Sequence, residues 1–175
     1  MMILLTGGAA CGKSSFGETL CSFFPAPRYY LAAMKPFGGE EKIAKHRKMR
    51  AGKGFETIER YTDYTNLALP HCKTVLLECI CNLTANEMFD ENGAVHDPRK
   101  AVIEGVRQIA AQCDDLVIIT NEVGSELCQY EKSTQDYVRA LGEINCALAE
   151  MADCVCELVC GIPLVKKGKL PEVAL

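Results

Sequence analysis

Short apolar runs of strand length recur along the chain and are separated by stretches of helical pattern. The runs are MILLT (2–6), RYYLAA (28–33), TVLLECI (74–80), DLVIIT (115–120) and CVCELVCG (154–161). TVLLECI is continuous rather than alternating, which is typical of a strand that is covered on both faces. The runs therefore predict the strands of a sheet that is buried between helices.

The stretches between these runs predict the helices. They are residues 12–24, 39–50, 99–113 and 134–152, with a shorter helix finishing in TNLALPH (65–71). Prolines end the first of these helices and glycines end the second, whereas residues 86–98 are polar and predict a loop. Strand and helix alternate, so we expect an α/β three-layer sandwich with a mostly parallel central sheet.

Length and composition fit one globular domain. The chain has 175 residues, of which 49% are hydrophobic and 24% charged, so we expect a single domain over residues 1–175. No window reaches the roughly 18 uninterrupted apolar residues of a membrane span, and the N-terminal MMILLTGG lacks the basic start of a secretory signal. We therefore expect a cytoplasmic protein with no membrane span.

The eleven cysteines form no C-x-x-C pair. Their close spacings, Cys79-x-Cys81 and Cys154-x-Cys156, fall inside apolar runs. Buried cysteine is a common small hydrophobe, and the usual spacings of metal ligands are missing. We interpret these residues as reduced core thiols, with a metal or cluster site as the alternative.

The sharpest motif, GGAACGKS, lies between the first predicted strand and the first predicted helix. It satisfies G-x-x-x-x-G-K-[ST], the phosphate-binding loop or P-loop. The predicted cradle consists of Gly7, Gly8, Ala9, Ala10, Cys11, Gly12, Lys13 and Ser14. Glycines let backbone N–H groups surround phosphate oxygens, Lys13 reaches the β- and γ-phosphates, and Ser14 can bind Mg²⁺. The alternative is a glycine-rich turn with no ligand.

A nucleotide site also needs an acid that organises the metal. In P-loop proteins this acid comes from the end of a neighbouring strand, and Glu78 is the acid inside the apolar run TVLLECI. An unpaired buried carboxylate is costly, which favours Mg²⁺ as its partner. A structural role for Glu78 is the alternative.

Other features narrow the class of P-loop protein. The chain has no N-K-x-D element for guanine, and TNEVG (120–124) lacks the lysine and the aspartate of that element. This argues against a switch GTPase. ATPase motors are normally larger, which leaves small-molecule kinases, whose basic segments close over the phosphates.

A basic segment, EKIAKHRKMRAGKG, spans residues 41–54. On a helix Lys42, His46 and Arg50 share one face, with Arg47 beside it. Such a face repels itself and would be relieved by an anionic ligand, and its cations favour a neutral, nucleophilic His46 imidazole. A solvated basic helix face is an equally open interpretation. A nucleic-acid site is disfavoured, because the net charge is −4 and the segment has no aromatic platform.

Several motifs in fixed order resemble one family. They are MILLTGGAACGKS, YLAA, IAKHRKMR, FETIE, LLECI, TNEVG, ALGEINCALAEMAD and GIPLVKKG, and they cover residues 2–168. This set resembles the bifunctional adenosylcobinamide kinase/adenosylcobinamide-phosphate guanylyltransferase family of cobalamin biosynthesis. The resemblance implies a RecA-like P-loop NTPase fold. It implies a kinase step on adenosylcobinamide, then transfer of GMP from GTP through a GMP-histidine to give adenosylcobinamide-GDP.

The resemblance also implies roles for individual residues. His46 would be the nucleophile, with Lys13 as the second catalytic residue, while Ser14 and Glu78 would hold Mg²⁺. The remaining nucleotide contacts would be Ala32, Ala33, Met34, Arg47, Lys48, Met49, Arg50, Glu59 and Glu78. The expected ligands are GTP, ATP, Mg²⁺ and the corrinoid, and the expected assembly is a homotrimer.

The chain departs from the family pattern at a few places. Ala10 and Cys11 replace an Arg and a Ser of the usual P-loop, PFGGEE replaces an acid-rich entry, and Phe55 stands where a tryptophan is common. Two other interpretations stay open. One is an unrelated small-molecule kinase in which His46 only touches phosphate, and the other is a regulatory module that binds GTP without consuming it.

Overall fold

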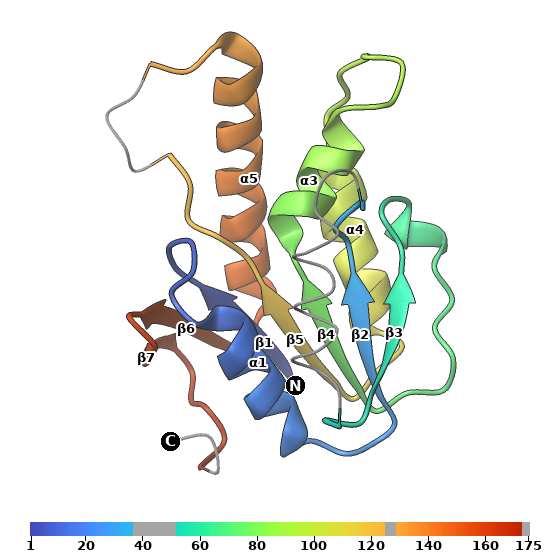
Figure 1. The fold of residues 1–175 in the computed structure, drawn as a ribbon, viewed down its shortest axis with the longest axis vertical. Coiled ribbons are helices and arrows are strands. Elements are labelled where there is room, and N and C mark those ends of the chain that lie inside the picture. The colour runs from blue at the N-terminus through green and yellow to red at the C-terminus, as the bar shows by residue number, and fades with distance from the viewer. Residues whose placement is uncertain (37–51, 125–128, 173–175) are drawn as a thin grey trace.

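A seven-stranded sheet runs through the middle of the computed structural model, which describes residues 1–36, 52–124 and 129–172 (Figure 1). The strands are β1 (Met2–Thr6), β2 (Arg28–Ala32), β3 (Phe55–Glu59), β4 (Thr74–Glu78), β5 (Asp115–Ile119), β6 (Cys154–Val159) and β7 (Ile162–Lys167). Their order is β3-β2-β4-β5-β1-β6-β7, and every pairing is parallel except that of β6 with β7. The predicted mostly parallel sheet is therefore confirmed.

Helices cover both faces of this sheet. They are α1 (Lys13–Ser22), α3 (Ile80–Met88), α4 (Arg99–Ala110) and α5 (Lys132–Met151), with a short 3₁₀ helix η1 (Tyr64–Asn66). One buried cluster joins α1 to alternate residues of the strands, such as Leu5 and Leu76. A second cluster joins α3, α4 and α5 to the intervening strand residues, such as Leu4 and Leu77, which point to the other face of the sheet. The sheet thus lies between two helical layers, as the alternation of apolar runs and helices predicts.

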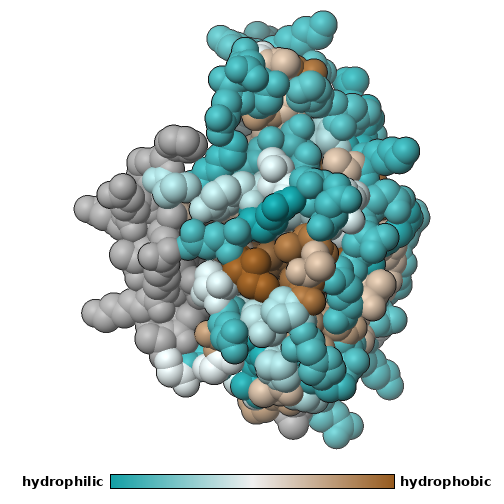
Figure 2. Space-filling model, turned by 90° about the vertical axis from the view of Figure 1, so that its right-hand side faces the viewer, coloured by the Kyte–Doolittle hydropathy of each residue, from teal (hydrophilic) through white to brown (hydrophobic). Residues whose placement is uncertain are grey.

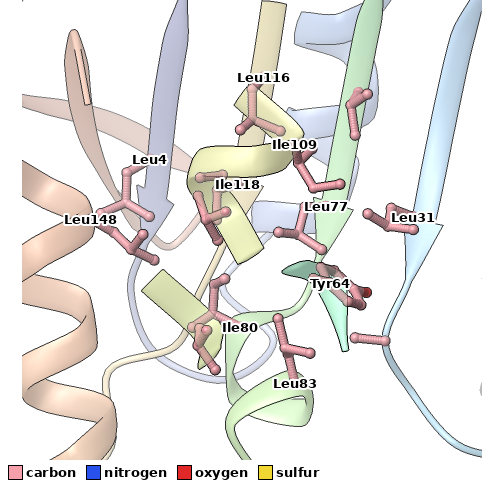
Figure 3. Packing of buried hydrophobic residues seen from close by; sticks show 14 of the residues in the cluster. Leu4, Leu31, Tyr64, Leu77, Ile80, Leu83, Ile109, Leu116, Ile118 and Leu148 are labelled. Carbon is pink, nitrogen blue, oxygen red and sulfur yellow. The ribbon is translucent and has the colours of Figure 1, made fainter. Parts of the chain in front are cut away.

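The second cluster is the larger part of the core and appears at close range in Figure 3. Leu4, Leu77 and Ile118 from the strands meet Ile109 of α4 and Leu148 of α5, and all five are at most 2% exposed. Burying a side chain of this size contributes about 1.5–3 kcal/mol relative to exposing it. This packing fixes the strand ends that carry the polar residues described below.

Close contact between α4 and η1 depends on a residue with no side chain. A Cβ atom built on Gly105 of α4 would lie 2.6 Å from Cβ of Tyr64. Tyr64 is 1% exposed and its hydroxyl donates to the carbonyl of Arg60. Gly105 therefore lets η1 approach α4 closely enough to bury the tyrosine ring.

The edge of the sheet at β3 is partly apolar. Figure 2 faces the side of the molecule on which β3 lies in Figure 1 and shows a small hydrophobic depression among hydrophilic side chains. Ile58 of β3 is one of the partly buried apolar residues that pack against the larger core cluster, together with Leu67 and Leu69.

Among the described residues, no helix is both long and apolar enough to cross a membrane.

Several predicted boundaries are wrong. The predicted strand 74–80 ends at Glu78, and α3 begins at Ile80, so the predicted loop 86–98 is helical as far as Met88. The predicted helix in TNLALPH is only the 3₁₀ turn η1, because Leu67 is extended and Pro70 cannot donate to a helix. The predicted helix 39–50 lies entirely outside the described residues.

Two strands were not predicted at all. β3 and β7 are the two edge strands, and most of their residues are at least partly exposed. Such strands lack the continuous apolar run by which β4 is recognised in the sequence. The sequence pattern therefore identifies the inner strands of this sheet and misses its margins.

Candidate nucleotide-binding site

The loop between β1 and α1 adopts a conformation that requires glycine. Gly7 has φ 133°, and a Cβ atom built there would lie 2.5 Å from the carbonyl oxygen of Leu158 on β6. Gly12 has φ 99° and caps α1 without a side-chain hydrogen bond. The backbone N–H groups of the first helical turn therefore face the loop with the positive end of the helix dipole behind them. This is the geometry that binds phosphate.

The ammonium group of Lys13 lies over the same loop. Lys13 is 5% exposed, and its Nζ donates to the carbonyl oxygens of Gly7 and Gly8 at 2.9 and 2.6 Å. The sulfur of Cys11 is 3.5 Å away. Carbonyl dipoles offset part of the cost of burying this charge. The positive charge is thus held where phosphate oxygens would enter the loop.

Ser14 and Glu78 are in direct contact. The Ser14 hydroxyl donates to Oε1 of Glu78 at 2.5 Å, and the Tyr30 hydroxyl donates to Oε2 at 2.7 Å. The expectation that Glu78 lies on a strand next to the P-loop strand is wrong, because β4 is not a neighbour of β1 and β5 lies between them. The long Glu78 side chain still reaches Ser14, so the two residues that the sequence predicts to hold Mg²⁺ lie in contact.

The donor set at this contact fits Mg²⁺. Hydroxyl and carboxylate oxygens are hard ligands, and Mg²⁺ is usually held by one or two of them together with water and substrate phosphates. The described part of the chain contains no group of three or more His, Cys, Asp or Glu residues that could hold a metal ion. An ion bound by Ser14 and Glu78 would take its remaining oxygens from water and from substrate phosphates.

Further predicted contacts lie along the same edge of the sheet. Ala32 at the end of β2 is in register with Glu59 at the end of β3 and with Glu78 at the end of β4. Ala33 is fully buried, and its N–H and C=O groups bond to Glu78 and to Asn86. Met34 is half-buried. The structure thus brings Ala32, Glu59 and Glu78 together, while it uses the backbone of Ala33 for support.

The structure describes only the last three residues of the basic segment, 52–54. His46, Arg47, Lys48, Met49 and Arg50 lie outside the described residues. Lys53, which follows them, donates from Nζ to Oε2 of Glu18 at 2.6 Å. Glu18 belongs to α1 and is fully buried. The C-terminal end of the basic segment is therefore attached to the helix that follows the P-loop.

The TNEVG stretch is anchored by residues that the sequence analysis did not select. Thr120 donates to the side-chain oxygen of Asn145 at 2.7 Å, and the amide of Asn145 donates to the backbone carbonyl of Asn121 at 3.3 Å. Asn145 lies in the middle of α5 and is half-buried, and an amide beside the apolar positions of a helical pattern is the one available signal. These bonds fix the end of β5 next to Glu78.

Two cysteines at the start of α3 influence each other. The Cys79 thiol donates toward Cys81 and, together with the Asn121 N–H, lowers the pKa of Cys81 to about 6. The Asn121 nitrogen is 3.2 Å from the Cys81 sulfur. The same contact and burial raise the pKa of Cys79. By contrast, burial alone is the main reason that the pKa of Cys113 rises to about 12.

Comparisons with known proteins match nearly the whole chain. A family model described as cobinamide kinase / cobinamide phosphate guanyltransferase matches residues 3–166. Proteins named bifunctional adenosylcobalamin biosynthesis protein CobU are similar, at 30% identity in Escherichia coli and 31% in Salmonella typhimurium. Each alignment covers 93% of this chain and 97% of the relative.

A solved structure supports the fold. It is an ATPase of the type III secretion system of pathogenic bacteria, with a TM-score of 0.54 and 10% identity. The match covers 89% of this chain and 51% of that protein. At this identity the likeness concerns only the fold, and it agrees with the predicted P-loop NTPase sandwich.

Proposed function

Since this chain belongs to the cobinamide kinase / cobinamide phosphate guanyltransferase family, we propose that it catalyses both reactions in cobalamin biosynthesis. The observation that carries the proposal is the family match over residues 3–166. The contact between Ser14 and Glu78 beside Lys13 supports it, because a kinase needs a phosphate cradle and a metal-binding acid at one place.

In the kinase step, the aminopropanol hydroxyl of adenosylcobinamide would attack the γ-phosphorus of ATP or GTP, and the nucleoside diphosphate would leave. The P-loop N–H groups and Lys13 would hold the phosphates and stabilise the charge on the transferred group. Ser14 and Glu78 would hold Mg²⁺, whose charge would neutralise the phosphate oxygens when it is bound. The product would be adenosylcobinamide phosphate.

In the guanylyl step, an imidazole nitrogen of His46 would attack the α-phosphorus of GTP, and pyrophosphate would leave. The substrate phosphate would then attack the phosphorus of the GMP-histidine, which would release the imidazole and form adenosylcobinamide-GDP. Arg47, Lys48 and Arg50 would balance the triphosphate, with Met49 between them. Ala32, Ala33, Met34 and Glu59 would contact the nucleotide at the ends of β2 and β3.

The proposal also covers the oligomeric state of the enzyme, its location in the cell and the place where the corrinoid binds. We expect a homotrimer in the cytoplasm, with the large corrinoid bound across a subunit boundary, because one small domain has little room to enclose it. These remain predictions. Size-exclusion chromatography with light scattering would test the trimer.

Labelled GTP separates the proposal from the two other interpretations. After incubation with α-labelled GTP, the proposal expects acid-labile, alkali-stable label on the protein, and His46→Asn should abolish it. An unrelated kinase would transfer only the γ-label to its substrate. A regulatory module would bind GTP and give neither product, so both the protein label and γ-transfer would be absent.

A further inference from the structure

The metal-binding carboxylate has a second partner that the sequence does not indicate. Oε1 of Glu78 accepts from Ser14, and Oε2 accepts from the Tyr30 hydroxyl at 2.7 Å. A carboxylate held at both oxygens cannot rotate freely about its terminal bond. By holding Oε2, the Tyr30 hydroxyl thus helps to fix the position of Oε1 beside the P-loop serine.

The sheet explains why Tyr30 makes this contact. Tyr30 lies on β2 opposite Leu76, and Ala32 lies opposite Glu78, so Tyr30 and Glu78 are a diagonal pair on one face. Tyr30 is 4% exposed and packs in the cluster that includes Leu20 of α1. The buried ring holds the hydroxyl in place, so the contact does not depend on a mobile surface side chain.

We propose that Tyr30 is a positioning residue that orients Glu78 for the Mg²⁺–nucleotide complex. Its hydroxyl donates to the carboxylate oxygen that does not face Ser14, and the Ser14 hydroxyl can go on donating to Oε1 while its lone pairs face the metal. Groups that orient a metal ligand typically change metal affinity by about 10- to 100-fold when they are removed. This inference rests on the proposed function of Ser14 and Glu78.

The neighbouring Tyr29 offers a matched control. Tyr29 is 7% exposed and belongs to the other core cluster, because consecutive residues of a strand point to opposite faces. Its pKa is raised by burial and by Glu56. Glu56 lies near the start of β3, whereas Glu59, the predicted nucleotide contact, lies at its end. Tyr29→Phe therefore removes one hydroxyl from the same strand on the face away from Glu78.

Binding of Mn²⁺, followed by electron paramagnetic resonance in the presence of a non-hydrolysable GTP analogue, tests the role. Tyr30→Phe should weaken Mn²⁺ binding about 10-fold, leave affinity for the analogue in EDTA unchanged, and raise the Mg²⁺ concentration needed for half-maximal γ-phosphate transfer. Tyr29→Phe should leave Mn²⁺ affinity within about 2-fold of the wild type. If Tyr30→Phe is too unstable to purify, Tyr30→Met fills the same space without a donor and should show the same loss.

The outcomes distinguish this inference from the function on which it rests. Wild-type protein that binds no Mn²⁺ with the analogue would overturn the proposed metal site itself. Wild-type binding with unchanged affinity in Tyr30→Phe would overturn only the role of Tyr30. Equal weakening in Tyr29→Phe and Tyr30→Phe would also overturn it, because a general loss of stability would then be sufficient.

Discussion

Individual side chains at the P-loop are placed as the proposed phosphate transfer would require. Lys13 is buried over the carbonyl groups of Gly7 and Gly8, and Ser14 is bonded to Glu78. A preorganised charge of this kind is most effective in a site from which water is excluded. The phosphate site is therefore the part of the molecule where a single substitution should have the largest effect on activity.

Replacing Lys13 tests this directly. Lys13→Ala should lower γ-phosphate transfer about 100- to 1,000-fold, because it removes a charge donor that stabilises the transferred group. Lys100→Ala, at an exposed position of α4, is the control and should retain full activity. Thermal unfolding of both variants checks that they fold. A folded Lys13→Ala enzyme with wild-type transfer would contradict the assignment.

The thiol pair gives a pH-dependent prediction. Because the pKa of Cys81 is lowered to about 6, its thiolate is present above that pH and is lost as the pH falls through it. Alkylation of Cys81 by iodoacetamide, followed by peptide mass spectrometry, should rise with a midpoint below that of an ordinary thiol. The midpoint should move upward in Cys79→Ala, which removes the hydrogen-bond donor. An identical midpoint in both proteins would rule out the role given to Cys79.

The sequence indicates the residues that meet at this candidate site, but it does not indicate the contacts that support them. The motif alone indicates Lys13 and Ser14, and Glu78 stands out as an acid in an apolar run. Nothing in the sequence separates Tyr30 from Tyr29, because their difference lies in which face of β2 each occupies relative to Glu78. The supporting contact depends on strand register, which the sequence pattern does not give.

Among the helices and strands, burial and packing determine which elements follow the apolar periodicity of the sequence and which do not. The inner strands and the helices α4 and α5 follow their apolar periodicity, so their existence was predictable. The helix α3 was not, because ICNLTANEM continues the apolar run of β4 and the turn at Cys79 carries no glycine or proline. The edge strands β3 and β7 were missed because their exposure breaks the apolar pattern.

Two helical glycines form a matched pair for testing packing. Gly105→Ala should destabilise the protein by about 1–3 kcal/mol, because the new methyl group would overlap Tyr64. Gly142→Ala on α5 meets nothing within 4 Å and should stabilise it by about 0.5–1 kcal/mol through helix propensity. Urea unfolding measures both. Stabilisation by both substitutions would mean that helix propensity controls both positions and that Gly105 is not needed for the contact with Tyr64.

At the scale of the whole molecule, the sheet order brings distant segments to one edge. Ala32, Glu59 and Glu78 come from three strands, and the P-loop comes from a fourth. The attachment of Lys53 to the buried Glu18 joins the end of the basic segment to α1. The parallel topology was predictable from alternation, but the order of the strands and this long-range ion pair were not.

Breaking the ion pair between Lys53 and Glu18 should cost more stability than breaking an ion pair on the surface. Lys53→Met would leave a buried carboxylate without its counter-charge and should cost about 1–3 kcal/mol. The double variant Glu18→Met/Lys53→Met should regain most of that loss, since it buries no charge. Lys73→Met, which breaks an exposed pair with Asp114, should cost less than about 1 kcal/mol. Equal losses in the two single variants would contradict the buried role of Glu18.

The most direct test of the account is an intact-protein mass spectrum after incubation with GTP and Mg²⁺, without corrinoid. The account predicts one added GMP per chain, located on His46 by peptide mapping and absent in His46→Asn. Adding adenosylcobinamide phosphate should remove it. A spectrum with no adduct, or an adduct that persists in His46→Asn, would contradict the guanylyl transfer that we propose.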